Sequence, residues 1–296
     1  MKIINSPVQK VNFNNLEIFV KRDDLLNEDF SGNKARKFYY FLQQDFPHIK
    51  KVVSFGSNQS NAMYSLSVLS RLKGWEFVYY ADHISSFLKQ YPTGNYKHAL
   101  KNGMKVLENK PLPETFDAET LFISEGGAVW EAEFGVKQLA FEIKEFAKAN
   151  NIEKSEELEI FLPSGTGTTA LFLQKNLPFK VLTCACVGDE SYLKKQFLQL
   201  VLNEDLHPTI LSASKKYHFG KLYEEFYLMY EKIKSETNIE FDLLYDPLGF
   251  MVLEKYLEEN PKKRVLYIHQ GGLLGNISML ERYARKPYFK FSNKKI

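Results

Sequence analysis

Short apolar runs alternate with amphipathic stretches along almost the whole chain, and this alternation limits the fold more than any other feature of the sequence. Apolar runs of strand length lie at residues 16–20, 51–55, 77–80, 158–162, 180–187 and 265–268. Stretches with helical periodicity lie at 34–45, 60–73, 131–149, 168–176, 192–202, 221–236, 248–259 and 276–283. Alternating strands and helices predict an α/β fold with open, twisted, mostly parallel sheets and helices on both faces. Residues 92–119 are poorer in pattern, and we interpret them as a surface connection.

Composition excludes several classes of protein. The 296 residues carry 39 basic and 36 acidic side chains, so no basic surface favours nucleic acid. No stretch has the length of a signal peptide or of a membrane helix, and we expect neither a membrane nor a nucleic-acid partner. The two cysteines, Cys184 and Cys186, are expected to be buried thiols, without a disulfide or a metal site. Low cysteine usage is typical of a cytoplasmic protein.

The first motif places a lysine where a helix begins. Gly32 and Asn33 supply a turn, and Lys34 follows with two more cations, Arg36 and Lys37. A lysine near the positive end of a helix and near other cations should have a lowered pKa, and a neutral amine is what imine formation needs. The competing interpretation is a solvated loop with scattered charge.

The second motif, Asn58-Gln59-Ser60-Asn61, lies between a predicted strand and a predicted helix. Its amide side chains and free backbone N–H groups could hold an anion such as a substrate carboxylate. Alternatively, Ser60 or Asn61 simply caps the helix.

The third motif, Gly165-Thr166-Gly167-Thr168-Thr169, also joins a strand to a helix. Glycines allow a close approach of the backbone to an anion, and the helix start offers N–H groups and hydroxyls, so this loop predicts a phosphate site. It is neither a Walker loop nor a complete dinucleotide fingerprint.

The fourth motif has the same form, with His269, Gln270, Gly271 and Gly272 after a strand. Gln270 could face the edge or nitrogen of a bound ring, whereas His269 is interpreted as structural. A phosphate cradle, an imine-forming lysine and a carboxylate pocket together indicate pyridoxal 5'-phosphate (PLP) chemistry.

These motifs, in this order, resemble the 1-aminocyclopropane-1-carboxylate (ACC) deaminase and D-cysteine desulfhydrase family of tryptophan-synthase-β-like PLP enzymes. The resemblance covers most of the chain and is carried chiefly by Gly32–Lys37 and Gln59–Asn61. It implies two α/β domains with PLP in the cleft. The larger domain would comprise residues 1–45 and 151–296, with a smaller domain inserted at 46–150. It also implies a homo-oligomer, expected to be a dimer.

The resemblance also implies site roles. Lys34 and Ser60 would be catalytic. The cofactor would be held by Lys34, Asn61, Gly165, Thr166, Gly167, Thr168, Thr169, Gln270 and Gly271. The small amino-acid substrate would meet Asn58, Gln59, Ser60, Asn61, Glu125 and Gly126, the last two from a Ser-Glu-Gly-Gly segment that resembles the family's glycine-bearing segment.

The chain departs from the family pattern at three points. Ala62 stands where relatives carry His or Gln, Gln270 where they carry Thr or Leu, and a Pro-Val-Tyr-x-Gly-Lys block is absent. We expect the tyrosine of that block to be missing, with Tyr245 or Tyr283 as a substitute. Because these departures fall near the substrate, β-elimination of D-cysteine is favoured over ACC ring opening. The remaining alternatives are a non-catalytic PLP-binding protein and a nucleotide-binding α/β protein that uses residues 164–169.

Overall fold

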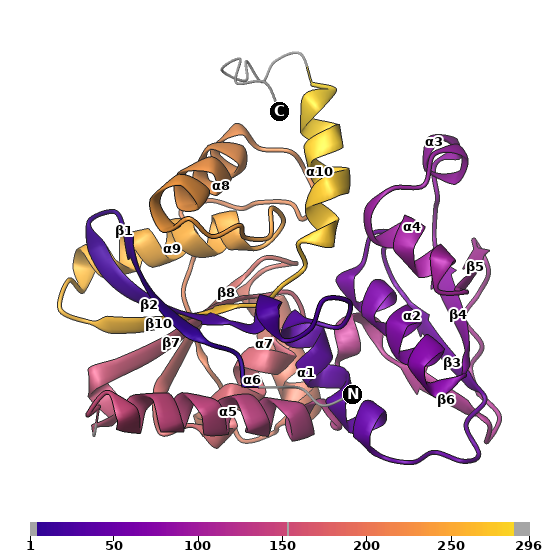
Figure 1. Ribbon diagram of the computed structural model, residues 1–296, viewed down its shortest axis with the longest axis horizontal. Coiled ribbons are helices and arrows are strands. Elements are labelled where there is room, and N and C mark those ends of the chain that lie inside the picture. Colours follow the sequence, from indigo (N-terminus) through magenta and orange to yellow (C-terminus); the bar gives the residue numbers. More distant parts are fainter. Residues whose placement is uncertain (1–4, 153, 287–296) are drawn as a thin grey trace.

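Two separate sheets organise the chain in a computed structural model that describes residues 5–152 and 154–286 (Figure 1). The larger sheet has six strands in the order β1-β2-β10-β7-β8-β9. Only β1 is antiparallel to its neighbour; the other pairs are parallel. The strands are β1 (Val8–Phe13), β2 (Leu16–Arg22), β7 (Leu158–Ser164), β8 (Lys180–Ala185), β9 (Thr209–Ile210) and β10 (Arg264–His269).

The smaller sheet has four parallel strands in the order β5-β4-β3-β6. They are β3 (Lys51–Phe55), β4 (Glu76–Ala81), β5 (Lys105–Glu108) and β6 (Thr120–Ile123), and the helices of this lobe are α2 (Asn61–Lys73), α3 (Ser86–Gln90) and α4 (Gly94–Lys101). Figure 1 shows this lobe on one side of the molecule, apart from the larger sheet.

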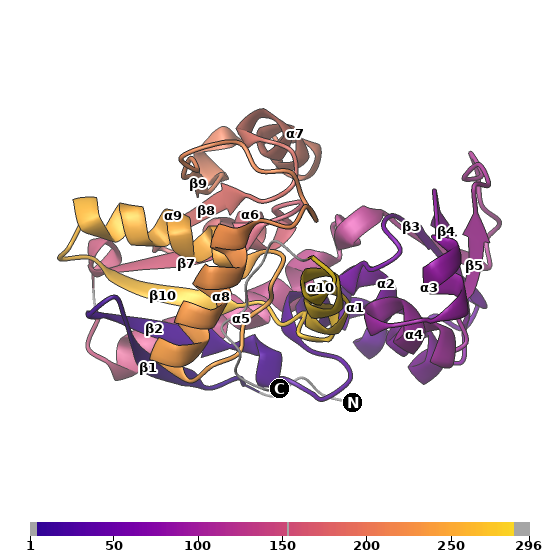
Figure 2. The same ribbon diagram turned by 90° about the horizontal axis from the view of Figure 1, so that it is seen from above.

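The remaining helices surround the larger sheet or lie between the lobes. They are α1 (Gly32–Gln43), α5 (Ala132–Ala149), α6 (Thr168–Asn176), α7 (Glu190–Leu200), α8 (Glu224–Thr237), α9 (Asp246–Glu259) and α10 (Leu274–Ala284). Seen from above, α1 and α10 lie between the two sheets (Figure 2). The predicted α/β architecture, with mostly parallel sheets, is confirmed.

Both faces of the larger sheet are covered, which explains why its central strands are mostly apolar, with Glu159 and Thr183 among the buried polar exceptions. In β7, Ile160 and Leu162 contact the cluster formed with α5, α6 and α7, whereas Phe161 points to the opposite cluster with α8 and α9. Successive side chains of a strand alternate between faces, so a strand buried on both faces needs apolar residues at most positions.

Helix α5 belongs to the core of the larger sheet, although it precedes residue 150 in the sequence. Its Val136, Leu139 and Ile143 are fully buried in the same cluster as α6 and β7. The expected inserted segment, 46–150, would have placed α5 with the smaller lobe. Hydrophobic periodicity shows that a helix has an apolar face but not which sheet covers that face.

The segment 92–119 contains more regular structure than a surface connection. It holds α4 and β5, and β5 forms an edge of the smaller sheet. The prediction was wrong there because both elements are short. A four-residue strand and an eight-residue helix give too few apolar positions for a clear period. Among the described residues, no helix is both long enough and apolar enough to span a membrane.

Candidate active site

A cavity of about 620 Å³ lies where the carboxyl ends of strands from both sheets converge. The segments that follow β3, β6, β7 and β10 all reach it, as does the first turn of α1. Open parallel sheets bind ligands at this edge. Every residue predicted for the site lines this one cavity: Lys34, Asn58, Gln59, Ser60, Asn61, Glu125, Gly126, Gly165, Thr166, Gly167, Thr168, Thr169, Gln270 and Gly271.

The first turn of α1 is held directly against the turn after β10. The Asn33 N–H donates to the Gln270 carbonyl at 3.0 Å. Gly32 has a φ of +65°, and a Cβ there would lie 1.9 Å from the Gln270 oxygen. Only glycine allows this approach, which fixes the start of α1 and places Lys34 in the cavity wall.

The amine of Lys34 is prepared for chemistry by burial. Loss of hydration lowers its pKa to about 8, and the charge of Asp242 acts in the opposite direction. The sequence prediction of a lowered pKa therefore agrees with the structure, but the cause is burial and not the helix end or the cations Arg36 and Lys37. The Arg36 guanidinium binds Asp23 and Glu142 on another side of α1.

Lys37 is a site residue that the sequence argument treated only as a nearby cation. It lines the cavity one helical turn after Lys34, and its Nζ donates to the Gly126 carbonyl at 3.0 Å and to Thr166 Oγ1 at 3.3 Å. Burial, together with the charge of Lys34, lowers its pKa well below 10.5. No carboxylate of the described residues pairs with it, so this lysine is available to an anion at the threonine loop.

The loop between β7 and α6 forms a cradle for an anion. Gly167, with a φ of +70°, is the N-cap residue of α6, and the hydroxyls of Thr166 and Thr168 lie 3.0 Å apart. Thr169 Oγ1 is buried and has no hydrogen-bond partner among the described residues. A buried hydroxyl without a partner, beside free helix N–H groups and a lysine, fits a bound phosphate.

The loop after β3 combines the two roles that its sequence suggested. Ser60 caps α2, because its Oγ accepts from the Ala62 and Met63 N–H groups at 3.2 and 3.3 Å, and it also lines the cavity. The amides of Asn58 and Gln59 donate to the carbonyls of His83 and Thr93. These two side chains thus hold the neighbouring loops of the smaller lobe.

Two carboxylates in the cavity wall were missed by the sequence analysis. Asp242 Oδ1 accepts from the backbone N–H groups of Leu244 and Tyr245, at 2.8 and 2.7 Å. Burial raises its pKa to about 7, which its hydrogen bonds and the charge of Lys34 oppose. Asp246 accepts from the Tyr267 hydroxyl at 2.6 Å, and burial and the charge of Asp242 raise its pKa well above 3.8. Such buried acids favour a cationic group of a ligand.

Of the two tyrosines expected as substitutes for the missing one, Tyr245 lies in the cavity wall. Its ring lines the cavity beside Gly165, and burial is the main reason that its pKa is raised. Tyr283, the other candidate, is fully buried in a separate cluster with Met279 and Leu243, and its hydroxyl donates to the Tyr223 carbonyl.

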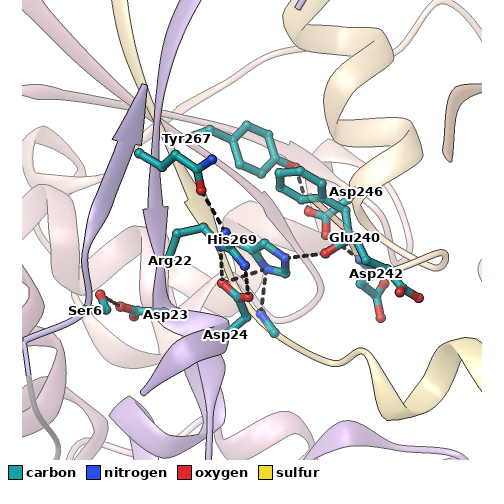
Figure 3. A network of polar contacts seen from close by, with 12 residues as sticks. Ser6, Arg22, Asp23, Asp24, Glu240, Asp242, Asp246, Tyr267 and His269 are labelled. Atoms are coloured by element: carbon teal, nitrogen blue, oxygen red, sulfur yellow. Dashed lines mark hydrogen bonds and ion pairs between the residues drawn. The ribbon is translucent and has the colours of Figure 1, made fainter. Parts of the chain in front are cut away.

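His269 is structural, as its sequence context suggested. It is completely buried, accepts from the Gly271 N–H through Nδ1 and contacts the Glu240 carbonyl through Nε2 at 2.8 Å (Figure 3). Asp24 lies 3.8 Å from Nδ1, and Arg22 binds Asp24. Burial lowers the His269 pKa, and a neutral ring with its proton on Nε2 satisfies both hydrogen bonds.

Gln270 lines the cavity, but its side-chain amide is occupied by the protein. It donates to the Pro163 carbonyl at 2.6 Å and accepts from the Asn33 amide at 2.9 Å. Its observed contacts therefore join the turn after β10 to β7 and α1, and the predicted contact with a bound ring stays a prediction.

No protein-family model matches the chain. A Thermotoga maritima protein provisionally named 1-aminocyclopropane-1-carboxylate deaminase is 25% identical to this chain, and the alignment covers 93% of each protein. The mitochondrial "Bifunctional D-cysteine desulfhydrase/1-aminocyclopropane-1-carboxylate deaminase" of Arabidopsis thaliana is 25% identical over 92% of this chain and 76% of its own length.

Solved structures give the same result for the fold. The structure of an "ACC deaminase homologue" matches 95% of this chain and 93% of its own, with a TM-score of 0.74 and 19% identity. The fold is that of the tryptophan-synthase-β-like PLP enzymes. A hydrogen sulfide-producing enzyme from Fusobacterium nucleatum also shares this fold, with a TM-score of 0.64 and 13% identity over 91% of this chain and 95% of its own. The resemblance to ACC deaminase and D-cysteine desulfhydrase, stated from motifs alone, is thereby confirmed.

A tryptophan-synthase-β-like PLP fold implies a cofactor with a phosphate, an aldehyde and a ring nitrogen, and the cavity offers a group for each. Thr169 and the α6 N-terminus suit the phosphate, with Lys37 beside them. Lys34 suits the aldehyde, and the buried carboxyls of Asp242 and Asp246 suit a protonated ring nitrogen.

Proposed function

We propose that this protein is a PLP-dependent enzyme that releases ammonia from a small amino acid, with D-cysteine as the preferred substrate. D-cysteine and water would give pyruvate, ammonia and hydrogen sulfide. One observation carries the proposal: Lys34 and the loop with Thr166, Thr168 and Thr169 line the same cavity. The pKa of Lys34 is lowered to about 8 there.

The cofactor would be held chiefly by residues of two segments, the first turns of α1 and the loop between β7 and α6. Thr166, Thr168 and Thr169 would bind its phosphate together with Lys37, and Lys34 would bind its aldehyde carbon. Bound PLP supplies a sink for the electron pair that is left when a bond at the substrate α-carbon breaks.

Lys34 would move the proton at the substrate α-carbon. Near pH 8, an amine with a pKa of about 8 is about half neutral, and this fraction can accept a proton and return it. The α-proton would go to the Lys34 amine, and the carbon–sulfur bond would break with its electron pair leaving on sulfur. Water then replaces the amino group on the three-carbon product, so atoms balance and no oxidant is needed.

Ser60 would lie beside the substrate, since its hydroxyl hydrogen is not used in capping α2. Its oxygen accepts two backbone N–H groups, and its O–H, which interacts with the Tyr79 hydroxyl, would turn to donate to a substrate oxygen. The Asn61 amide carbonyl accepts from Asn95 at 2.6 Å, which fixes the orientation of this side chain in the cavity wall.

The second candidate is ACC deaminase, with 2-oxobutanoate and ammonia as products. The names of both 25%-identical relatives include this activity, whereas only one of them includes D-cysteine desulfhydrase. We keep D-cysteine first because the departures of this chain, Ala62 among them, surround the substrate. By the same resemblance we propose a homodimer, which light scattering of the purified protein would test.

The test is the visible spectrum of the purified protein with PLP, before and after borohydride. A visible imine band, reduced by borohydride with the label on the peptide containing Lys34, is the expected result. Lys34→Ala should lose the band and turnover of D-cysteine, while the surface variant Lys50→Ala keeps both. A colourless protein, or a Lys34→Ala protein with full turnover and an unchanged band, would overturn the proposal.

A further inference from the structure

The cavity extends beyond the predicted cofactor and carboxylate groups to an outer part beside α10. Ser278, Glu281, Arg282 and Arg285 of α10 line it, at positions that share one helix face. Phe87 of α3, from the smaller lobe, also lines it. This outer part lies between the lobes and holds none of the groups assigned to the phosphate, the aldehyde or the ring nitrogen.

Arg282 enters the outer part without a carboxylate partner among the described residues. One guanidinium nitrogen donates to the Gly220 carbonyl at 2.8 Å, and another contacts the Met279 sulfur at 3.1 Å. A guanidinium has five N–H donors in a planar fork, so three remain for a ligand. The two protein contacts orient the fork at the cavity without neutralising its charge.

The one carboxylate of the described residues in this outer part is already engaged. Glu281 accepts from the Thr93 hydroxyl at 2.9 Å, and its other oxygen lies 3.7 Å from Arg285. Arg285 in turn lies over the Phe87 ring, 4.2 Å from its centroid. Glu281 and Arg285 thus contact residues of the smaller lobe and each other, and Arg282 is the cation left for a ligand.

We propose that the substrate side chain ends in a second anionic group, such as a carboxylate, which Arg282 binds at the outer end of the cavity. The proposal rests on the proposed function and narrows its substrate class to D-cysteine derivatives whose sulfur carries an anionic substituent. A guanidinium and a carboxylate form two parallel charge-assisted hydrogen bonds, which gives both affinity and orientation. D-Cysteine itself lacks the group that Arg282 binds, so it would react without this contact.

Two substrates whose sulfur carries a two-carbon substituent test this specificity. S-carboxymethyl-D-cysteine and S-ethyl-D-cysteine both lose the α-proton and a thiolate, and both give pyruvate and ammonia after hydrolysis, but only the first has a terminal carboxylate. The holoenzyme should favour the carboxymethyl compound by about tenfold or more in kcat/KM, mainly through KM. Equal values for the two compounds would overturn the proposal.

Variants of Arg282 assign the preference to this side chain. Arg282→Gln should remove the preference for the carboxymethyl compound, whereas Arg282→Lys should restore part of it. Arg71→Gln is the matched control, because Arg71 is exposed on α2 and pairs with Asp29. A preference that survives in Arg282→Gln contradicts the assignment.

A binding measurement separates this inference from the proposed function. Calorimetry should show that the PLP-loaded protein binds glutarate at least about fivefold more tightly than butyrate, and that Arg282→Gln abolishes the difference. If the protein shows no imine band but keeps this difference, the enzyme proposal fails and the Arg282 site stands. If the band is present and the difference is absent, the Arg282 site fails and the enzyme proposal stands.

Discussion

Helix α1 carries buried cations on two sides, and the cation on one side is paired with carboxylates whereas those on the other side are not. On one side, Arg36 is fully buried and binds both Asp23 and Glu142, and Lys21 of β2 pairs with the same Glu142 at 2.7 Å. On the other side, Lys34 and Lys37 line the cavity without a carboxylate contact among the described residues. The three positions lie within four consecutive residues of one helix.

The difference separates a structural charge from a functional one. The two cations and two anions of the Arg36 network cancel, so desolvation is offset by ion pairs, and α1 is joined to β2 and α5. Burial of Lys34 and Lys37 is not offset in this way, and their pKa values fall. A buried charge without an ion-pair partner, such as that of Lys34 or Lys37, lowers the stability of the fold, and we interpret it as serving a bound ligand.

Removal of Arg36 should give the largest loss of stability. Arg36→Ala leaves two buried carboxylates with one lysine, and the expected decrease in the free energy of unfolding is about 3–5 kcal/mol. Urea unfolding of the PLP-free protein measures it. A loss below about 1 kcal/mol would show that the network adds little, and the contrast between the two sides of α1 would disappear.

Removal of Lys37 should have the opposite effect on stability and a large effect on the cofactor. Lys37→Met removes a buried cation without a carboxylate partner, so the PLP-free protein should be as stable as the original or more stable. Affinity for PLP should fall by about tenfold or more, because a charge-assisted hydrogen bond to the phosphate is lost.

Titration with free PLP, followed by the visible band, gives the affinity, and thermal unfolding gives the stability. Lys175→Met on α6 is a control, since this exposed pair with Glu133 lies outside the cavity. Unchanged PLP affinity in Lys37→Met would place the phosphate elsewhere.

The contribution of Lys34 should depend on pH in a defined direction. Its folded pKa of about 8 is below the ordinary 10.5, so the unfolded chain binds this proton more tightly. The destabilisation by Lys34 is complete below about pH 8 and disappears as the pH rises toward 10.5. Lys34→Met should therefore be more stable than the original protein at pH 7, by a margin that shrinks at pH 10.

Urea unfolding of both PLP-free proteins at the two pH values checks this. The difference between the two proteins reports Lys34 together with its effect on the neighbouring Lys37 and Asp242. A margin that is the same at pH 7 and pH 10 would contradict the lowered pKa.

An exposed ion pair should give the smallest change in the free energy of unfolding. Lys50 and Glu119 form a salt bridge, with side chains 69% and 55% exposed. Lys50→Ala should change the free energy of unfolding by less than about 1 kcal/mol, because water already solvates both charges. A larger change in urea unfolding would mean that burial is not what makes the Arg36 ion pairs more important than an exposed pair.

Much of the candidate site could be predicted from the sequence because its glycine and threonine motifs directly follow strands. Parallel strands of one sheet bring their carboxyl ends to one edge, so Gly165–Thr169 and Gln270–Gly271, which follow the neighbouring strands β7 and β10, had to meet once the fold was α/β. Gln59–Asn61 follow β3 of the smaller sheet, and only the tertiary structure brought them to the same cavity.

The segment that carries Asp242 and Tyr245 has no comparable motif. Its two acids, Asp242 and Asp246, became visible only when the fold placed them in the cavity wall, and the fold decided between Tyr245 and Tyr283.

The sequence by itself determined the α/β class, the helix that carries Lys34 and the order of the ligand-binding turns, since these depend on local periodicity and on glycine. Only the tertiary structure decided which sheet receives α5, which cations of α1 are paired, and that Asp242 and Arg282 face the same cavity as Lys34. Burial and ion pairing depend on residues far apart in the chain. Arg36 meets Glu142 across 106 positions, and no local pattern records that contact.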